Sequence, residues 1–283
     1  MRRIAGLALA LLLILGAAVP AAARQNSKHD HHNSTLFATG RIGTALLAID
    51  VKRGNTRLIG PTRQPGSVAL AITRNGKAAY SIASAVTGFP PGIDGANAQL
   101  VKIDLETGAA TLVGSPLGGN LSVMGMTFAP DGALYAAGDF DPQSPTFNSL
   151  YTIDLHTGLA TRVGSLGSGP NDTDFIMSFA WDSDGTLYGA SMTALYRIHR
   201  NRTTNMATKV VDFVGSSAVM GIAIDEDGGF YAADFVDPPT LSTIYKVDVE
   251  TGFLAPLFNT GIAFVHNIAF KPDTSGSHHD KDY

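Results

Sequence analysis

The chain repeats one pattern along most of its length, and residues 124–164 (MGMTFAPDGALYAAGDFDPQSPTFNSLYTIDLHTGLATRVG) form the clearest copy. Four runs of alternating apolar residues follow one another in this copy, at residues 124–129, 133–137, 150–154 and 160–164. Turn residues such as Asp131-Gly132 and Thr157-Gly158 separate the runs. An alternation of period two is typical of β-strands, and four strands joined by turns make an antiparallel sheet. The repeat therefore predicts the blade of a β-propeller.

The number of copies predicts a ring of five blades. The first strand of the pattern occurs five times, beginning at Val68, Met124, Ile176, Val219 and Val265. The N-terminal copy starts one strand late, whereas residues 265–270 form a first strand without the other three. We expect the C-terminal strand to pair into the N-terminal blade, because a ring sealed in this way leaves no free sheet edge.

The predicted fold is therefore an all-β, five-bladed β-propeller with four antiparallel strands per blade, spanning residues 35–273. An open β-solenoid is the alternative. Its ends need caps rather than a complementary strand, so the repeat count favours the propeller.

Residues 1–23 are typical of a secretory signal peptide, with two arginines, an apolar run and a small-residue end at Ala21-Ala22-Ala23. We expect a secreted or periplasmic protein with no membrane span after cleavage. A retained anchor is the alternative, although the apolar run is short for one. Residues 24–34 and 274–283 are polar, rich in His and without apolar periodicity. They should form two disordered tails.

The composition excludes several kinds of partner and cross-link. The chain has 24 acidic and 20 basic residues, a formal net charge of −4 and no cluster of basic residues, so we expect no nucleic-acid partner. It has no Cys, so the domain must be stable without disulfides, which a packed core of this size allows. We expect a monomer.

An Asp-x-x-Thr-Gly motif recurs at residues 104–108, 154–158 and 248–252. Its presence in three copies favours a structural role over a catalytic one. The Asp carboxylate can accept backbone N–H bonds within a hairpin, and the Gly can adopt a positive φ. The Asp-Gly pairs after the first strands, such as Asp184-Gly185, are interpreted in the same way.

The repeat units Leu150-Tyr151-Thr152-Ile153-Asp154, Thr157-Gly158, Val163-Gly164 and Asp184-Gly185-Thr186-Leu187-Tyr188 carry a resemblance that covers nearly all of the mature chain. The sequence is similar to secreted bacterial propellers of the quinoprotein-like and YVTN-like superfamily. That resemblance implies the architecture but no particular function, because such propellers include enzymes, adhesion proteins and surface-display modules. The chain departs from six-bladed lactonase-like propellers in blade number, so their metal site is not transferred to it.

The loops between second and third strands, and those between blades, should share one face of the ring, and they carry acidic and aromatic residues. Carboxylates can bind Ca²⁺, and carboxylates beside aromatic rings can bind a sugar. The alternative is that these are ordinary loop acids and packing aromatics. The candidate ligand-binding residues are Asp139, Asp141, Asp172, Asp174, Asp234, Asp237, Phe140 and Phe235.

His266 is the most unusual single residue, because it stands where other first strands have Met or Val. It could bind a soft metal such as copper or act as a general base, and packing is the alternative. The tails offer a second set of metal ligands for Zn²⁺ or Cu²⁺, although two solvated tails would explain them equally well. These ligands are His29, His31, His32, His278 and His279.

Two functions of different classes follow. The first is a secreted, non-enzymatic propeller that binds a glycan or protein through the acidic and aromatic loops. The second is a metal-assisted hydrolase or lyase that uses the loop Asp residues and His266. Metal chelation by the His-rich tails is a further alternative.

Overall fold

The computed structural model describes residues 35–87, 92–141, 144–167 and 174–272, which form twenty β-strands and no helix. The predicted signal peptide, both tails with their five histidines, Asp172 and the predicted last propeller residue, Asp273, lie outside these residues. Blade 1 contains β1 (Leu36–Gly40), β2 (Ala45–Asp50), β3 (Asn55–Pro61) and β20 (Ile268–Phe270). Blade 2 contains β4 (Ala71–Ile72), β5 (Ala79–Thr87), β6 (Gly92–Ile103) and β7 (Ala110–Pro116).

The other three blades follow without interruption in the sequence. Blade 3 contains β8 (Val123–Phe128), β9 (Leu134–Gly138), β10 (Ser149–Ile153) and β11 (Ala160–Ser165). Blade 4 contains β12 (Ser178–Trp181), β13 (Leu187–Ala190), β14 (Ala194–Ile198) and β15 (Ala207–Asp212). Blade 5 contains β16 (Val219–Ile224), β17 (Phe230–Asp234), β18 (Thr243–Val247) and β19 (Leu254–Asn259).

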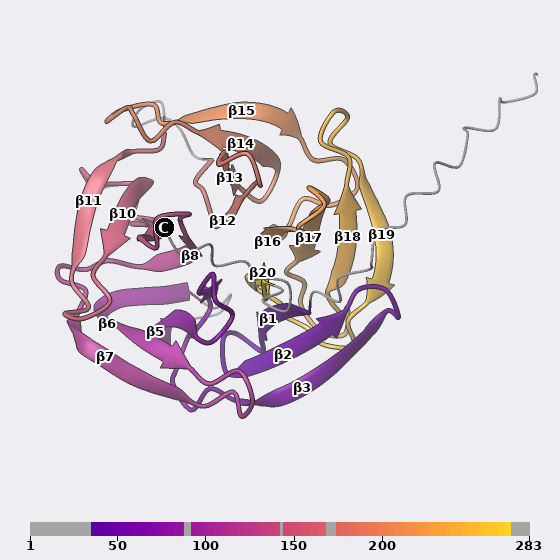
Figure 1. Ribbon diagram of the computed structural model, residues 1–283, viewed down its shortest axis with the longest axis horizontal. Coiled ribbons are helices and arrows are strands. Elements are labelled where there is room, and N and C mark those ends of the chain that lie inside the picture. Colours follow the sequence, from indigo (N-terminus) through magenta and orange to yellow (C-terminus); the bar gives the residue numbers. More distant parts are fainter. Residues whose placement is uncertain (1–34, 88–91, 142–143, 168–173, 273–283) are drawn as a thin grey trace, which may run out of the picture. The chain divides into compact units, whose positions relative to one another are not determined.

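The five blades surround a common axis, as Figure 1 shows for the described residues, so the predicted five-bladed propeller is confirmed. Each sheet is antiparallel and runs outward from an inner strand, in the orders β20-β1-β2-β3, β4-β5-β6-β7, β8-β9-β10-β11, β12-β13-β14-β15 and β16-β17-β18-β19. A register shift interrupts the pairing of the third strand with the outer strand in every blade. Such bulges bend an edge strand and make it a poor template for further pairing.

The ring is sealed by β20, as the repeat count predicts. Leu36 of β1 pairs with Phe270, and Ala38 pairs with Ile268. The backbone bonds continue past the strand, because His266 N donates to Thr39 O at 2.8 Å and Thr39 N donates to Asn267 O at 3.1 Å. The C-terminal segment thus supplies the inner strand of the blade that the N-terminal segment begins.

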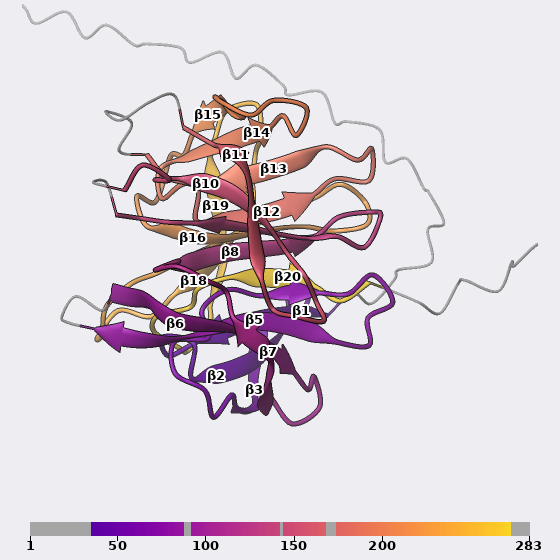
Figure 2. The same ribbon diagram turned by 90° about the vertical axis from the view of Figure 1, so that its left-hand side faces the viewer.

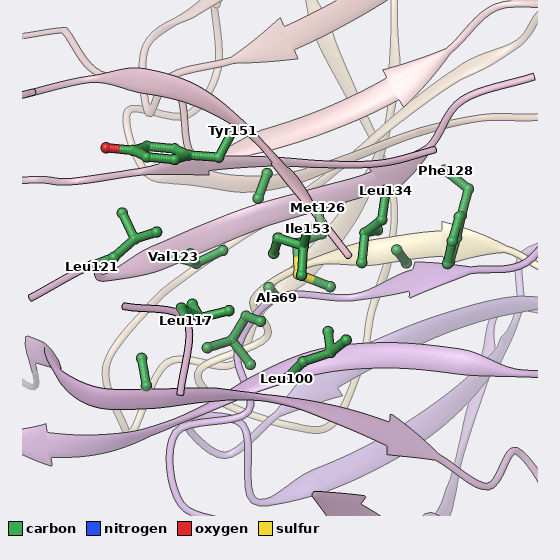
Figure 3. Packing of buried hydrophobic residues seen from close by; sticks show 14 residues of the cluster. Ala69, Leu100, Leu117, Leu121, Val123, Met126, Phe128, Leu134, Tyr151 and Ile153 are labelled. Atoms are coloured by element: carbon green, nitrogen blue, oxygen red, sulfur yellow. The ribbon is translucent and has the colours of Figure 1, made fainter. Parts of the chain in front are cut away.

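The core lies between blades rather than within them. In the cluster shown in Figure 3, Leu100 and Leu117 of blade 2 pack with Val123, Met126 and Leu134 of blade 3, and all five are buried. A four-stranded sheet has too little thickness to bury its own side chains, so each blade uses its neighbours. Burial of apolar surface stabilises by about 25 cal/mol per Å².

The Asp-x-x-Thr-Gly turns also hold neighbouring blades together. Asp104 Oδ1 accepts hydrogen bonds from Glu106 N at 2.9 Å and Thr107 N at 2.8 Å. The Asp of this motif therefore accepts backbone N–H bonds within its turn, as predicted. Gly60, on the outer strand of the preceding blade, leaves room for this turn, because a Cβ on Gly60 would lie 2.1 Å from Thr107 O. The repeat Gly on β3 therefore serves the contact with the next blade.

Blade 2 departs from the predicted pattern. The Gly and Pro residues within residues 84–97 favour a long loop, but β5 continues to Thr87 and β6 begins at Gly92, with Val86 paired to Ile93. The two strands extend beyond the rest of the blade (Figure 2). The β-branched residues Val86 and Ile93 pair here, although Gly and Pro residues lie between them in the sequence. The inner strand β4 contains only Ala71–Ile72, whereas the sequence predicts a first strand that begins at Val68.

Candidate functional site

The two faces of the propeller differ in their connections. Inner strands all run in one direction along the axis, so the turns from first to second and from third to fourth strands share one face, here called the turn face. The links from second to third strands and from blade to blade share the other, here called the loop face. Within the described residues, no helix has the length and apolar character needed to traverse a lipid bilayer.

The side chain of Asn267 lies at the axis, where it bonds directly to blades 3 and 4 and is linked through Ser178 to blade 5. Its Nδ2 donates to the carbonyl oxygen of Met124, and to that of Met177 at 3.4 Å. Ser178 Oγ donates to Asn267 Oδ1 at 2.8 Å and accepts a bond from Ile222 N at 3.0 Å. Asn267 is 1% exposed, so these bonds satisfy a buried amide.

Small residues at the equivalent positions of the other inner strands make room for this amide: Ala69, Gly125, Ser178 and Gly221. A Cβ on Gly125 would lie 2.6 Å from Met177 O, and one on Gly221 would lie 2.5 Å from His266 O. The inner strands are therefore in contact at this level. We call this set of five positions the Asn267 layer.

His266 is one residue nearer the loop face and is enclosed. Its side chain is 3% exposed, and its ring centroid lies 4.6 Å from that of Phe235. Burial lowers the pKa of His266 to about 3, so the imidazole is neutral at ordinary pH. Its buried Nδ1 has no hydrogen-bond partner among the described residues.

Three of the predicted loop-face acids hold their own loops. Asp139 accepts bonds from Ser144 Oγ at 2.5 Å and from Thr146 Oγ1. Asp234 accepts bonds from Thr243 N at 2.6 Å and from the Tyr245 hydroxyl at 2.7 Å. Asp174 accepts one from the Tyr196 hydroxyl. Burial and the bond to Asp234 raise the pKa of Tyr245 to about 12.

The remaining loop-face candidates are more accessible. Asp141 and Asp237 are exposed, and Phe140 and Phe235 are half-buried. The ring centroids of Phe140 and Phe175 are 4.9 Å apart. Within the described parts of the chain, no three His, Cys, Asp or Glu residues are grouped closely enough to hold a metal ion.

The turn face contains a cavity on the axis, with a volume of about 800 Å³. All five inner strands line it with their last two residues. The last residues are large and apolar: Ile72, Phe128, Trp181, Ile224 and Phe270. The preceding residues are small: Ala71, Thr127, Ala180, Ala223 and Ala269. The Asn267 layer lies between this cavity and His266 in the order of residues along β20 and the segment before it.

Charged residues from the turns complete the cavity. Asp182 and Asp184 come from blade 4, Asp225 and Glu226 from blade 5, and Arg74 from blade 2. These residues were not among the predicted site residues, because the Asp-Gly turns were interpreted as structural. The large apolar residue that ends every inner strand is the signal that could have revealed the cavity.

No protein-family model and no curated protein matches the sequence. Among solved structures, a chain of a nidogen/laminin complex has a TM-score of 0.50 and 10% identity, with 84% of this chain and 98% of that chain covered. TolB from Acinetobacter baumannii has a TM-score of 0.49 and 15% identity, with 85% and 66% covered. The PQQ-bound aldose sugar dehydrogenase from Streptomyces coelicolor has a TM-score of 0.46 and 15% identity, with 83% and 81% covered. At such identities a likeness shows the fold alone. The chain is therefore a β-propeller protein, and the likeness to these solved structures extends to the fold alone.

Proposed function

We propose that this protein is an exported, non-enzymatic propeller that binds a ligand in the axial cavity of its turn face. The observation that carries the proposal is the cavity itself, whose volume of about 800 Å³ is formed by all five blades. Small-molecule sites in proteins have volumes of about 300 to 1,000 Å³. The signal-peptide pattern of residues 1–23 supports export.

The walls of the cavity combine two kinds of contact. Each inner strand pairs with only one other strand, so the other edge of its backbone is directed towards the axis. Its N–H and C=O groups can therefore bind polar parts of a ligand. The apolar side chains of Trp181, Ile224 and Phe270 are only half-buried, and a ligand would cover them. An apolar pocket with a few polar groups is typical of a binding site.

Binding is favoured over catalysis by the place of His266, the candidate base. A general base must come within about 3 Å of the proton that it abstracts. His266 is 3% exposed beneath Phe235 and on the other side of the Asn267 layer from the cavity. It is therefore better suited to packing than to proton transfer.

Trp181 provides a direct test, because it is the only tryptophan in the chain and lines the cavity. Phenylnaphthylamine is an uncharged apolar fluorophore, and we expect it to brighten on binding and to quench Trp181 emission. The variant Thr127→Phe places a ring on the half-buried wall of the cavity and should abolish both signals. The control Thr161→Phe makes the same change at an exposed position on the outer strand of the same blade. Equal dye binding by Thr127→Phe and the wild type would refute the proposal.

A second candidate is the binding of a glycan or protein on the loop face, as the sequence suggests. It is supported by the half-buried Phe140 and Phe175 rings beside the exposed Asp141. A flat aromatic pair next to a carboxylate can stack on a sugar ring and accept its hydroxyl bonds. Oligosaccharide binding that Phe140→Ala weakens and Thr127→Phe leaves unchanged would support this candidate, and the opposite pattern would favour the axial cavity.

A further inference from the structure

The charges around the axial cavity are distributed unevenly. Its lining includes four carboxylates, all on blades 4 and 5, and one guanidinium, Arg74, on blade 2. In a ring of five, blade 2 faces the junction of blades 4 and 5 across the axis (Figure 1). The cavity therefore has an acidic side and a single cation opposite it.

The acidic turns of blades 4 and 5 adjoin each other. Asp182 Oδ1 lies 3.9 Å from the position that a Cβ on Gly228 would occupy. Asp184 accepts a hydrogen bond from Thr186 N at 2.8 Å. Bonds from Thr186 and the nearby Arg197 lower the pKa of Asp184, so this carboxylate is charged at neutral pH. The turn geometry thus keeps negative charge at the mouth.

Cations outside the cavity lining offset part of this charge. Lys246 Nζ lies 3.7 Å from Asp225 Oδ2 and 3.9 Å from the centre of the Tyr231 ring. Arg197 Nη2 donates to Thr186 Oγ1 at 3.4 Å. Arg200 Cζ lies 4.7 Å from the centre of the Trp181 ring. Asp225 is thus paired with Lys246, and Asp182 and Asp184 are the carboxylates on the blade 4 edge of the cavity.

We infer that the ligand is an amphipathic organic cation, that is, an ammonium or guanidinium group attached to an apolar body. This inference rests on the proposed function. The apolar body contacts the half-buried Trp181, Ile224 and Phe270, and the cationic group lies at the carboxylates of Asp182 and Asp184. Charge complementarity of this kind discriminates between ligands of similar shape, because a like charge at the same place is repelled.

The test uses three probes with the same apolar body: phenylbutylammonium, phenylbutanol and phenylbutyrate. Their displacement of phenylnaphthylamine is measured by its fluorescence. We expect the ammonium to bind most tightly and the carboxylate most weakly. Asp182 is half-buried and Asp184 is exposed, so the two ion contacts together give a preference of about tenfold for the ammonium over the alcohol. Raising the ionic strength from about 0.01 M to about 1 M should remove it, because the screening length falls from about 30 Å to about 3 Å.

The double variant Asp182→Asn/Asp184→Asn removes the charge and retains acceptors for the turn bonds. We expect it to bind phenylbutylammonium about tenfold more weakly and phenylbutanol unchanged. The control is Asp131→Asn, because Asp131 has the same turn position in blade 3 and accepts a bond from Ala133 N at 3.0 Å, but does not line the cavity. It should bind all three probes as the wild type does.

The outcomes separate the two proposals. If the alcohol binds as tightly as the ammonium, or the double variant binds the ammonium normally, the inference about charge is overturned and the cavity remains a binding site. If the dye itself does not bind, the proposed function fails as well. A melting temperature for the double variant equal to that of the wild type shows that the change is not one of folding.

Discussion

The burial of neutral His266 predicts a specific dependence of stability on pH. The folded state holds the pKa of His266 at about 3, whereas an unfolded chain has the ordinary value of 6.5. Between these values the unfolded chain binds one more proton than the folded protein. The titration of His266 therefore costs no stability above the unfolded pKa. As the pH falls from there towards the folded pKa, the free energy of unfolding decreases.

The magnitude follows from the linkage relation. Each pH unit in this window changes the free energy of unfolding by about 1.4 kcal/mol for one proton. Between about pH 7 and about pH 4.5, His266 therefore lowers the stability by about 2 to 3 kcal/mol. Other groups also titrate in this range, so the quantity to measure is the difference between the wild type and a variant that lacks this imidazole.

The variant His266→Met introduces the residue found at the equivalent position in three other blades, at Met124, Met177 and Met220. Met is apolar and adaptable, and it makes favourable contacts with aromatic rings such as that of Phe235. We expect the variant to gain about 2 to 3 kcal/mol over the wild type between about pH 7 and about pH 4.5. Urea unfolding at both pH values, followed by circular dichroism, measures this gain.

The matched control is His156→Gln, which removes an exposed imidazole from the turn after β10. This variant should lack the gain of about 2 to 3 kcal/mol expected of His266→Met. If His266→Met also lacked that gain, the reasoning would be refuted, because the imidazole would then be protonated to the same extent in the folded and unfolded states. An opposite change, with the variant losing stability relative to the wild type at low pH, would mean that the folded protein favours the imidazolium.

Four further changes test the fold and the tails. Asn267→Leu should lower the free energy of unfolding by about 2 to 4 kcal/mol, because it removes the bonds to Met177 O and Ser178 Oγ and adds bulk to a packed layer. Urea titrations measure this change, and an unchanged midpoint would contradict the prediction. Gly60→Ala should cost about 1 to 3 kcal/mol through its contact with the next blade, measured in the same way, and wild-type stability would show that this contact is loose. Deletion of residues 265–283 should abolish soluble folding, and a cooperative melt of the truncated chain would disprove the role of the closing strand. Removal of the tails, residues 24–34 and 274–283, should abolish binding of Zn²⁺ or Cu²⁺ in metal analysis of untagged protein, and undiminished metal content would exclude tail chelation.

The sequence predicts the ring well because each blade is specified locally. The alternation within residues 124–164 and the Asp-x-x-Thr-Gly turns depend on neighbours in the chain, and both are found as predicted. The number of first strands also predicts the pairing of β20 with β1. These features need no knowledge of which blades face each other.

The axial features were harder to predict, because they arise only when five strands meet. The sequence predicts a possible functional role for His266, because it is an imidazole among Met and Val residues. In the structure its neighbour Asn267 forms the hydrogen bonds that cross the axis. The contrast of Asn267 with Gly125 and Gly221 at the same repeat position was available in the sequence. Which half of the axis is packed and which is hollow depends on side chains from all five blades. The large apolar residue that ends every inner strand was thus the one sign of the turn-face cavity in the sequence, and the structure was needed to show that this end of the axis is hollow.

The pairing of Leu36 with Phe270 links the two extremes of the folded domain. During synthesis, four blades can be complete on the ribosome while the first still lacks its innermost strand. The last strand of the ring to be translated must then insert beside the first, and contacts so distant along the chain form slowly. Until β20 is in place, the inner edge of β1 has no partner strand, and the pairing of these two strands closes the ring in a single step.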